Sequence, residues 1–156
     1  MSAVEDRLAG LGRTLPGVAA PVAAYVPAVR EGDLVWTSGQ LPMVGGALVA
    51  TSKVGDGEGL VAPDQAKELA RICALNALAA VKSVVGDLDA VQRVVKVVGF
   101  VASDPGFTGQ PGVVNGASEL LGQVFGDAGI HARSAVGVAV LPLDAPVEVE
   151  ITVRVG

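Results

Sequence analysis

The segment 147–155 alternates strictly between apolar and polar side chains. A repeat of two residues is the pattern of a β-strand that buries one face and exposes the other. The segment therefore predicts a half-buried strand, which is stable only within a sheet whose apolar face is covered by another layer. The apolar positions are Val147, Val149, Ile151, Val153 and Val155, and the polar positions are Glu148, Glu150, Thr152 and Arg154.

Other segments supply further strands for such a sheet. The stretch from Val91 to Ala102 is rich in valine and has few polar residues, which is typical of a strand buried on both faces. We also expect an early hairpin and a strand that is joined to the alternating segment through residues 142–146. The hairpin has strands at 25–29 and 34–37 around a turn at 30–33, the joined strand covers 134–141, and a short strand is expected at 47–49.

Two longer segments have the spacing of amphipathic helices. The first covers 64–85, with Pro63 at a first helical position and Gly86 as its stop. The second begins near Pro111, repeats its apolar residues three and four positions apart, and ends at Gly126. The order of elements is therefore strands, helix, strand, helix, strands. This order predicts an α+β fold with one mixed sheet and the two helices on one face.

The chain is expected to form a single domain, because 156 residues are too few for two ordinary ones. We assign residues 23–156 to this domain and residues 1–22 to an N-terminal helix and linker. Ser2 and Glu5 form a capping box for that helix, which is predicted to end by Gly12. The linker covers 15–21. The glycine-rich segment 39–62 is predicted to be mostly loop, with a mobile part at 55–59.

Composition favours a folded protein whose surface is partly covered by other subunits. Apolar residues make up 51% of the chain and charged residues 17%, which is far from the composition of disordered proteins. A mean hydropathy of +0.55 is high for a monomer, yet no apolar run reaches the length of a membrane span. The N-terminal residues include acids and lack the apolar core of a secretory signal. We therefore expect a cytoplasmic oligomer.

Several classes of site are disfavoured by the residues present. The net charge of −5 and the absence of a basic run argue against a nucleic-acid surface. Cys73 is the single cysteine, which excludes an internal disulfide and a multi-cysteine metal cluster, and we expect it to be a small buried hydrophobe. His131, the single histidine, has no acidic or cysteine partner at a catalytic spacing, so a structural role is expected for it.

Three short motifs, taken in their order and spacing, resemble the signature of the RidA (YjgF) family. The resemblance covers residues 25 to 155 and extends to the helix that contains Asn76, the segment Gly99-Phe100-Val101 and the pair Val114-Asn115. The motifs are Thr37-Ser38-Gly39-Gln40 after a strand, Ala132-Arg133-Ser134 at the start of another, and Val147-Glu148-Val149-Glu150 in the last.

The resemblance implies a chorismate-mutase-like fold, a homotrimer, and clefts between its subunits. Archetypal members hydrolyse reactive enamines and imines to 2-oxo acids and ammonia, with no cofactor and no metal. Carried over by position, Arg133 would bind the substrate carboxylate and Glu148 would position or activate water. Tyr25, Gly39, Asn115 and the backbone of Ala135 would line the cleft.

The chemistry of these residue types agrees with those roles. A guanidinium group presents a planar fork of donors that matches a carboxylate and does not lose its charge, so Arg133 suits an anchor. Hydrolysis of an imine needs a proton at nitrogen and a water at carbon, and one carboxyl group can serve both steps. Glu148 is therefore the candidate acid and base.

A distance argument places these two residues in different subunits. If the last two strands form a hairpin that turns near Asp144, Glu148 lies close to the turn and Arg133 at the far end. At about 3.4 Å per residue, the offset along the ladder is on the order of 20 Å. A shared site would then have to lie between subunits.

The candidate residues are also compatible with purely structural roles, and the sequence departs from the family pattern in three respects. Arg133 could equally be a surface arginine, and Glu148 and Glu150 could lie on a solvated strand face. Asn115 could form a hydrogen bond to a nearby loop, and Tyr25 could pack in the core. The chain also has an added N-terminal helix, a longer loop at 41–62, and Ala135 where archetypes commonly have cysteine. Three functions are considered: an enamine or imine deaminase, a non-catalytic binder of small carboxylic acids, and, least favoured by the acidic charge, an endoribonuclease.

Overall fold

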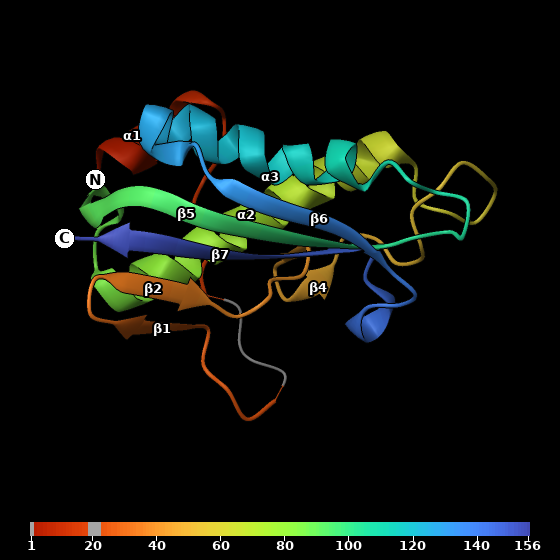
Figure 1. Cartoon of the computed structure of the whole chain (residues 1–156), viewed down its shortest axis with the longest axis horizontal. Coiled ribbons are helices and arrows are strands. Elements are labelled where there is room, and N and C mark those ends of the chain that lie inside the picture. The colour runs from red at the N-terminus through yellow and green to blue at the C-terminus, as the bar shows by residue number, and fades with distance from the viewer. Residues whose placement is uncertain (1, 19–22) are drawn as a thin grey trace.

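The computed structural model describes residues 2–18 and 23–156 and shows a sheet covered on one face by helices (Figure 1). The five-stranded sheet has the order β1-β2-β7-β5-β6, and a separate two-stranded sheet pairs β3 with β4. The strands are β1 (Ala28–Glu31), β2 (Leu34–Thr37), β3 (Met43–Val44), β4 (Ala47–Leu48), β5 (Val91–Ala102), β6 (Ala132–Val138) and β7 (Val147–Val155), and the helices are α1 (Ala3–Gly10), α2 (Pro63–Val85) and α3 (Gln110–Phe125). The predicted α+β architecture is confirmed.

β7 lies in the middle of the sheet and follows the predicted alternation. Val147, Val149 and Ile151 are buried against the helical layer, whereas the glutamates at 148 and 150 are only half-buried on the other face. We refer to the face without helices as the open face.

Within the described residues, no helix is both long enough and apolar enough to cross a membrane.

The prediction that the last two strands form a hairpin is wrong. β5 lies between them, antiparallel to β7 and parallel to β6, and β6 is an edge strand (Figure 1). A parallel pair needs a crossover, and α3 provides it between β5 and β6. The chain then passes from the edge strand, through 139–146, to the opposite side of β5. Strand order depends on this crossover, which periodicity does not encode.

The helix termini follow local signals in the sequence. Ser2 caps α1 and forms the predicted capping box with Glu5. Val4 and Leu8 of this helix belong to the same apolar cluster as the sheet and the other helices. α2 begins at Pro63 and ends before Gly86, as expected. Residues 15–18 of the predicted linker lie outside helices and strands, and its remaining residues fall outside the described part of the chain.

The boundaries of β1 and β6 differ from the prediction at both ends. The first strand was expected from Tyr25, but β1 begins at Ala28, since Pro27 has no N–H to donate to a ladder. The hairpin turn is tighter than expected, because Glu31 pairs with Leu34 and Gly32 takes a positive φ. β6 ends at 138 instead of 141. Within the predicted loop 39–62, the short strand expected at 47–49 is confirmed as β4.

Candidate functional site

Arg133 projects from the edge strand β6 toward the first half of α3. Its Nη1 donates to Oδ1 of Asn115 at 2.7 Å and to Oγ of Ser118 at 3.2 Å. Its Nη2 donates to the carbonyl oxygen of Pro111 at 3.3 Å. Both hydrogens of Nη1 are thus engaged with the helix. Among the described residues, Nε–H and one of the two Nη2 hydrogens have no hydrogen-bond partner.

The position of Asn115 depends on two glycines that let α3 approach its neighbours. A Cβ atom at Gly99 of β5 would overlap the side chain of Val114, and one at Gly116 would overlap the backbone oxygen of Lys67 in α2. α3 is therefore seated closely on both the sheet and α2. This seating places Asn115 within reach of Arg133.

Ser118 and His131 form a second polar pair next to Arg133, which the sequence analysis did not predict. Ser118 Oγ lies 2.9 Å from Nε2 of His131, and Nδ1 of His131 lies 2.6 Å from the carbonyl oxygen of Gly129. Ser118 follows Asn115 by three residues, so both side chains lie on the same face of α3. This spacing was the available signal. Without the contact to β6 it did not distinguish Ser118 from an ordinary helix serine.

Gly39 and Glu148, two further candidate residues, lie next to each other on the open face of the sheet, away from Arg133. Gln40 and Val149 exchange two backbone hydrogen bonds, at 2.8 and 3.0 Å, which extends the pairing of β2 with β7 beyond Thr37. A Cβ atom at Gly39 would overlap the carboxylate of Glu148. Glycine is therefore required at position 39 if Glu148 keeps this conformation.

The environment of Glu148 favours its protonated form. Burial is the main cause that raises the pKa of its carboxyl group above the usual value, and the negative charge of Glu150 raises the pKa further. A carboxyl group with a raised pKa is a better proton donor near neutral pH. This direction agrees with the acid and base role that the resemblance implies.

Arg133 and Glu148 lie on opposite faces of the same sheet. Arg133 pairs with Val97, whose side chain is buried under the helices, whereas Glu148 pairs with Phe100 and belongs to the open face. The two pairing positions on β5 are three residues apart, 97 to 100, which is about 10 Å along the strand. Two strand spacings add about 10 Å across the sheet. Because these offsets are perpendicular, they combine to about 14 Å in the plane of the sheet, less than the roughly 20 Å expected from a hairpin, and the two side chains also lie on opposite faces.

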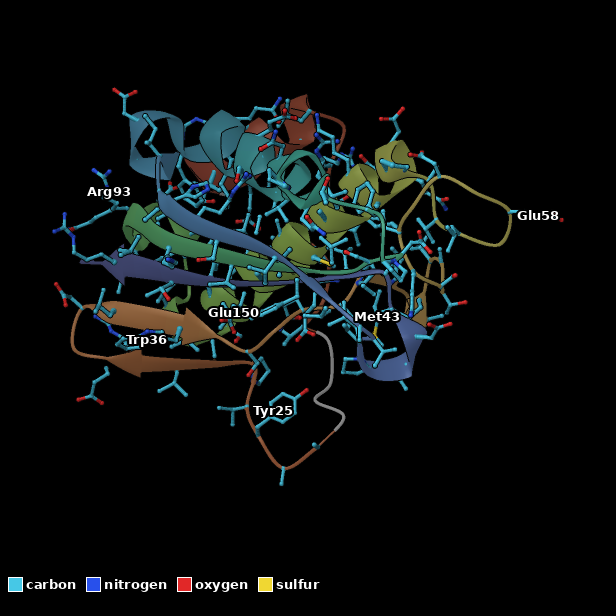
Figure 2. All side chains as sticks on the ribbon, turned by 45° about the vertical axis from the view of Figure 1, so that its right-hand side comes forward. Tyr25, Trp36, Met43, Glu58, Arg93 and Glu150 are labelled. Carbon is cyan, nitrogen blue, oxygen red and sulfur yellow. The ribbon has the colours of Figure 1, made fainter. Side chains whose placement is uncertain are left out.

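The remaining candidates occupy separate positions. Ala135 follows Arg133 by two residues on β6, and pairs with Gly99. As an edge strand of the described sheet, β6 has peptide groups on its outer side that no strand in the described part of the chain engages. Tyr25 lies on the loop that leads to β1, with 46% of its surface exposed, and Figure 2 shows it away from the helices. One chain therefore brings Arg133 near Asn115 and Gly39 near Glu148, but does not join these pairs.

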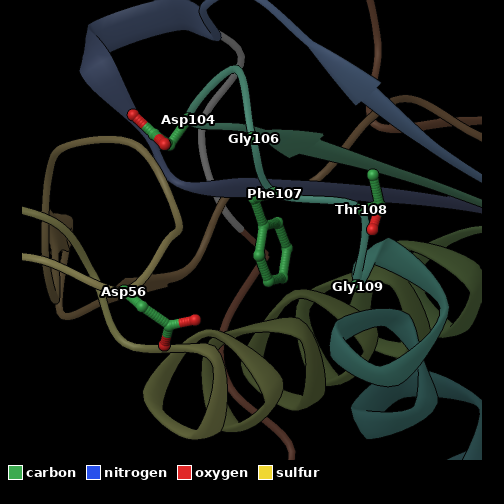
Figure 3. Close-up of a pocket in the computed structure, with 6 residues that line it drawn as sticks. All are labelled: Asp56, Asp104, Gly106, Phe107, Thr108 and Gly109. Atoms are coloured by element: carbon green, nitrogen blue, oxygen red, sulfur yellow. The ribbon is translucent and has the colours of Figure 1, made fainter.

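Two neighbouring hollows lie at the start of α3. One, of about 280 Å³, is lined by Asn115, Lys67 and Phe107 among others. The other, of about 420 Å³, is lined by Asp56, Asp104 and Phe107 among others, and both carboxylates lie to the left of the Phe107 ring in Figure 3. The described residues include no group of three or more histidine, cysteine, aspartate or glutamate side chains arranged to hold a metal ion.

Comparison with known proteins agrees with this fold and motif set. Residues 5–153 match the model of a family described as YjgF/chorismate mutase-like, a description that also assigns an endoribonuclease activity provisionally. The match covers nearly the whole chain. The protein therefore belongs to the YjgF/chorismate mutase-like family, and the resemblance to RidA (YjgF) is confirmed.

Individual relatives extend over similar lengths. Protein TCP17 of Trypanosoma cruzi is 45% identical over 154 residues, which are 97% of this chain and 93% of that protein. The crystal structure of Atu1372 from Agrobacterium tumefaciens, of unknown function, is 45% identical, with a TM-score of 0.91 over 99% of this chain and 93% of that one. E. coli TdcF with bound serine is 26% identical, with a TM-score of 0.61 over 92% of this chain and 97% of that one.

Proposed function

We propose that the protein hydrolyses reactive enamines and imines of small carboxylic acids to 2-oxo acids and ammonia. The observation that carries this proposal is the state of Arg133. Its guanidinium group is held by two side chains of α3, and along its Nε and Nη2 edge the Nε–H has no hydrogen-bond partner among the described residues. Such an edge offers two parallel N–H donors, which is the geometry that a carboxylate prefers.

Glu148 would supply the proton transfers. In its protonated form it donates to the imine nitrogen, and as a carboxylate it then accepts a proton from the water that attacks the imine carbon. The resulting carbinolamine loses ammonia and leaves the carbonyl oxygen of the 2-oxo acid. One water is consumed and no electrons are transferred, so the reaction requires neither an oxidant nor a reductant. The raised pKa of Glu148 supports the first of these steps.

We further propose that this site forms between subunits of a homotrimer. Arg133 and Glu148 lie on opposite faces of the sheet in one chain, so a second chain has to bring its own Glu148 to the Arg133 edge. Apolar side chains on the open face support such contact, since Val29, Trp36 and Val136 are 52%, 42% and 43% exposed. Trp36 and Glu150 are labelled on this face in Figure 2. Tyr25 and the backbone of Ala135 would complete the cleft.

The neighbours support a small carboxylate ligand. TdcF was solved with serine, an amino acid whose carboxylate is the kind of group that an arginine edge binds. The endoribonuclease activity in the family description is less well supported in this chain, because a net charge of −5 opposes a phosphate backbone. Non-catalytic binding of a 2-oxo acid is the second candidate function, because the carboxylate-binding part of the proposed site, Arg133 with Asn115, is complete within one chain.

An enzyme assay distinguishes catalysis from binding. A pyridoxal-phosphate dehydratase acting on threonine or serine supplies 2-aminocrotonate or 2-aminoacrylate, and release of the 2-oxo acid is followed with and without the protein. We expect acceleration that falls by about 10²- to 10⁴-fold in Glu148→Gln. A lack of acceleration, combined with 2-oxobutanoate binding that disappears in Arg133→Ala, would select the binder instead.

A further inference from the structure

His131, Ser118 and Arg133 form a continuous chain of hydrogen bonds behind the proposed carboxylate anchor. The chain runs from the carbonyl oxygen of Gly129 to Nδ1 of His131 at 2.6 Å, from Nε2 to Ser118 Oγ at 2.9 Å, and from Ser118 Oγ to Nη1 of Arg133 at 3.2 Å. It links three elements that follow one another in the sequence: α3, the turn at 126–129 and β6.

The direction of each hydrogen bond follows from the groups at the two ends. A carbonyl oxygen only accepts, so Nδ1 of the neutral imidazole carries the hydrogen, and Nε2 must accept. At the other end, a guanidinium group only donates. The Ser118 hydroxyl therefore donates to His131 and accepts from Arg133. Because Nε2 of His131 accepts its hydrogen, the Ser118 hydroxyl is held in a single orientation.

We propose that His131 is a positioning residue that sets the guanidinium of Arg133 for carboxylate binding. By accepting the Ser118 hydrogen, it turns the lone pairs of Ser118 toward Nη1. Asn115 and Ser118 then hold both Nη1 hydrogens, and the Nε and Nη2 edge is presented to the ligand. Without this acceptor, the Ser118 hydroxyl can rotate, and its lone pairs are no longer directed at Nη1. This inference rests on the proposed function and adds the residue that fixes the orientation of its anchor.

Two variants of His131 separate hydrogen bonding from packing. In His131→Gln, the amide oxygen can occupy the position of Nε2 and still accept from Ser118, whereas His131→Met fills similar space without an acceptor. We expect 2-oxobutanoate, titrated by NMR, to bind His131→Met about 3- to 10-fold more weakly than the wild type. His131→Gln should restore most of the affinity. Ser83→Ala, a serine change on α2 remote from Arg133, is the control.

A double variant tests whether the two residues act through one hydroxyl. Ser118→Ala removes the acceptor from Arg133 altogether, so adding His131→Met to it should weaken binding no further. Additive losses would contradict the inference. If His131→Met does not fold, Ser118→Ala and His131→Gln provide the same test, and wild-type affinity in Ser118→Ala would overturn the proposal.

A ligand-free measurement separates this inference from the proposed function. The Nη1 hydrogens of Arg133, which Asn115 and Ser118 hold, should exchange with water more slowly by NMR in the wild type and His131→Gln than in His131→Met. Unchanged exchange in His131→Met would overturn the role of His131, whatever the protein binds. Failure of the wild type to bind 2-oxobutanoate, with the exchange difference present, would instead reject the substrate class and keep the positioning role.

Discussion

Glu150 influences the chemistry of Glu148 through its charge. The two carboxyl groups lie two residues apart on the open face of β7, and the charge of Glu150 disfavours ionisation of Glu148. Glu150→Gln removes this charge, so the pKa of Glu148 should fall. The pH limb of kcat/KM that reports Glu148 should then move to lower pH. Glu31→Gln, an exposed change on β1, should leave the limb in place, and an unchanged limb in Glu150→Gln would contradict the assignment.

Cys73 illustrates a residue whose expected role is confirmed. It is fully buried in α2, and burial, followed by the charge of Glu148, raises the pKa of its thiol well above the usual value. Since the thiolate is the reactive form, native protein should react with a thiol reagent only as fast as it opens. Reaction at full rate in urea is the control. Rapid, complete labelling of native protein would show that the thiol is accessible.

At the residue level, the sequence identified groups whose chemistry is evident from their type. Arg133 and Asn115 were named together and do form a 2.7 Å hydrogen bond. Ser118 was missed, and His131 was expected only to be structural. Their importance depends on α3 and β6 being neighbours, a contact between residues that no local spacing encodes.

At the level of elements, the close seating of α3 is open to a direct test. Gly116→Ala should destabilise the protein by about 1–3 kcal/mol, because its methyl group would meet the backbone of α2. Gly122→Ala on the same helix has open space and should stabilise by about 0.5–1 kcal/mol through helix propensity. Urea unfolding measures both free energies. Equal effects of the two changes would show that α3 does not depend on this approach.

The helices and strands themselves were largely predictable from the sequence, whereas the order in which the strands pair in the sheet was not. Periods of two and of three to four residues identified β7, α2 and α3 to within a residue or two. The position of β6 was predicted incorrectly, because a parallel pair through a helical crossover and a hairpin leave similar local patterns. The prediction that β5 is buried on both faces is wrong, because only one face of the sheet is covered by helices: Val94 and Val97 are buried, whereas Val95 is 40% exposed.

At the level of the whole molecule, the central claim is that the site is shared between chains. The sheet separates Arg133 from Glu148, so the proposed reaction depends on assembly. Variants of apolar residues on the open face should therefore reduce activity together with oligomer size. We expect Trp36→Glu to shift the sedimentation coefficient toward the monomer and to lower activity in parallel. Loss of activity in an intact oligomer would indicate a direct role for Trp36 instead.

Subunit mixing tests the shared site most directly. Arg133→Ala and Glu148→Ala chains are co-expressed in equal amounts and purified through a tag that both chains carry, so that all combinations are retained. If each site takes Arg133 from one chain and Glu148 from the next, random equal mixing should restore about one quarter of the wild-type sites. Wild type mixed equally with the Arg133→Ala/Glu148→Ala chain should also retain about one quarter. No activity in the first mixture and about one half in the second would place both residues in one chain and contradict the account.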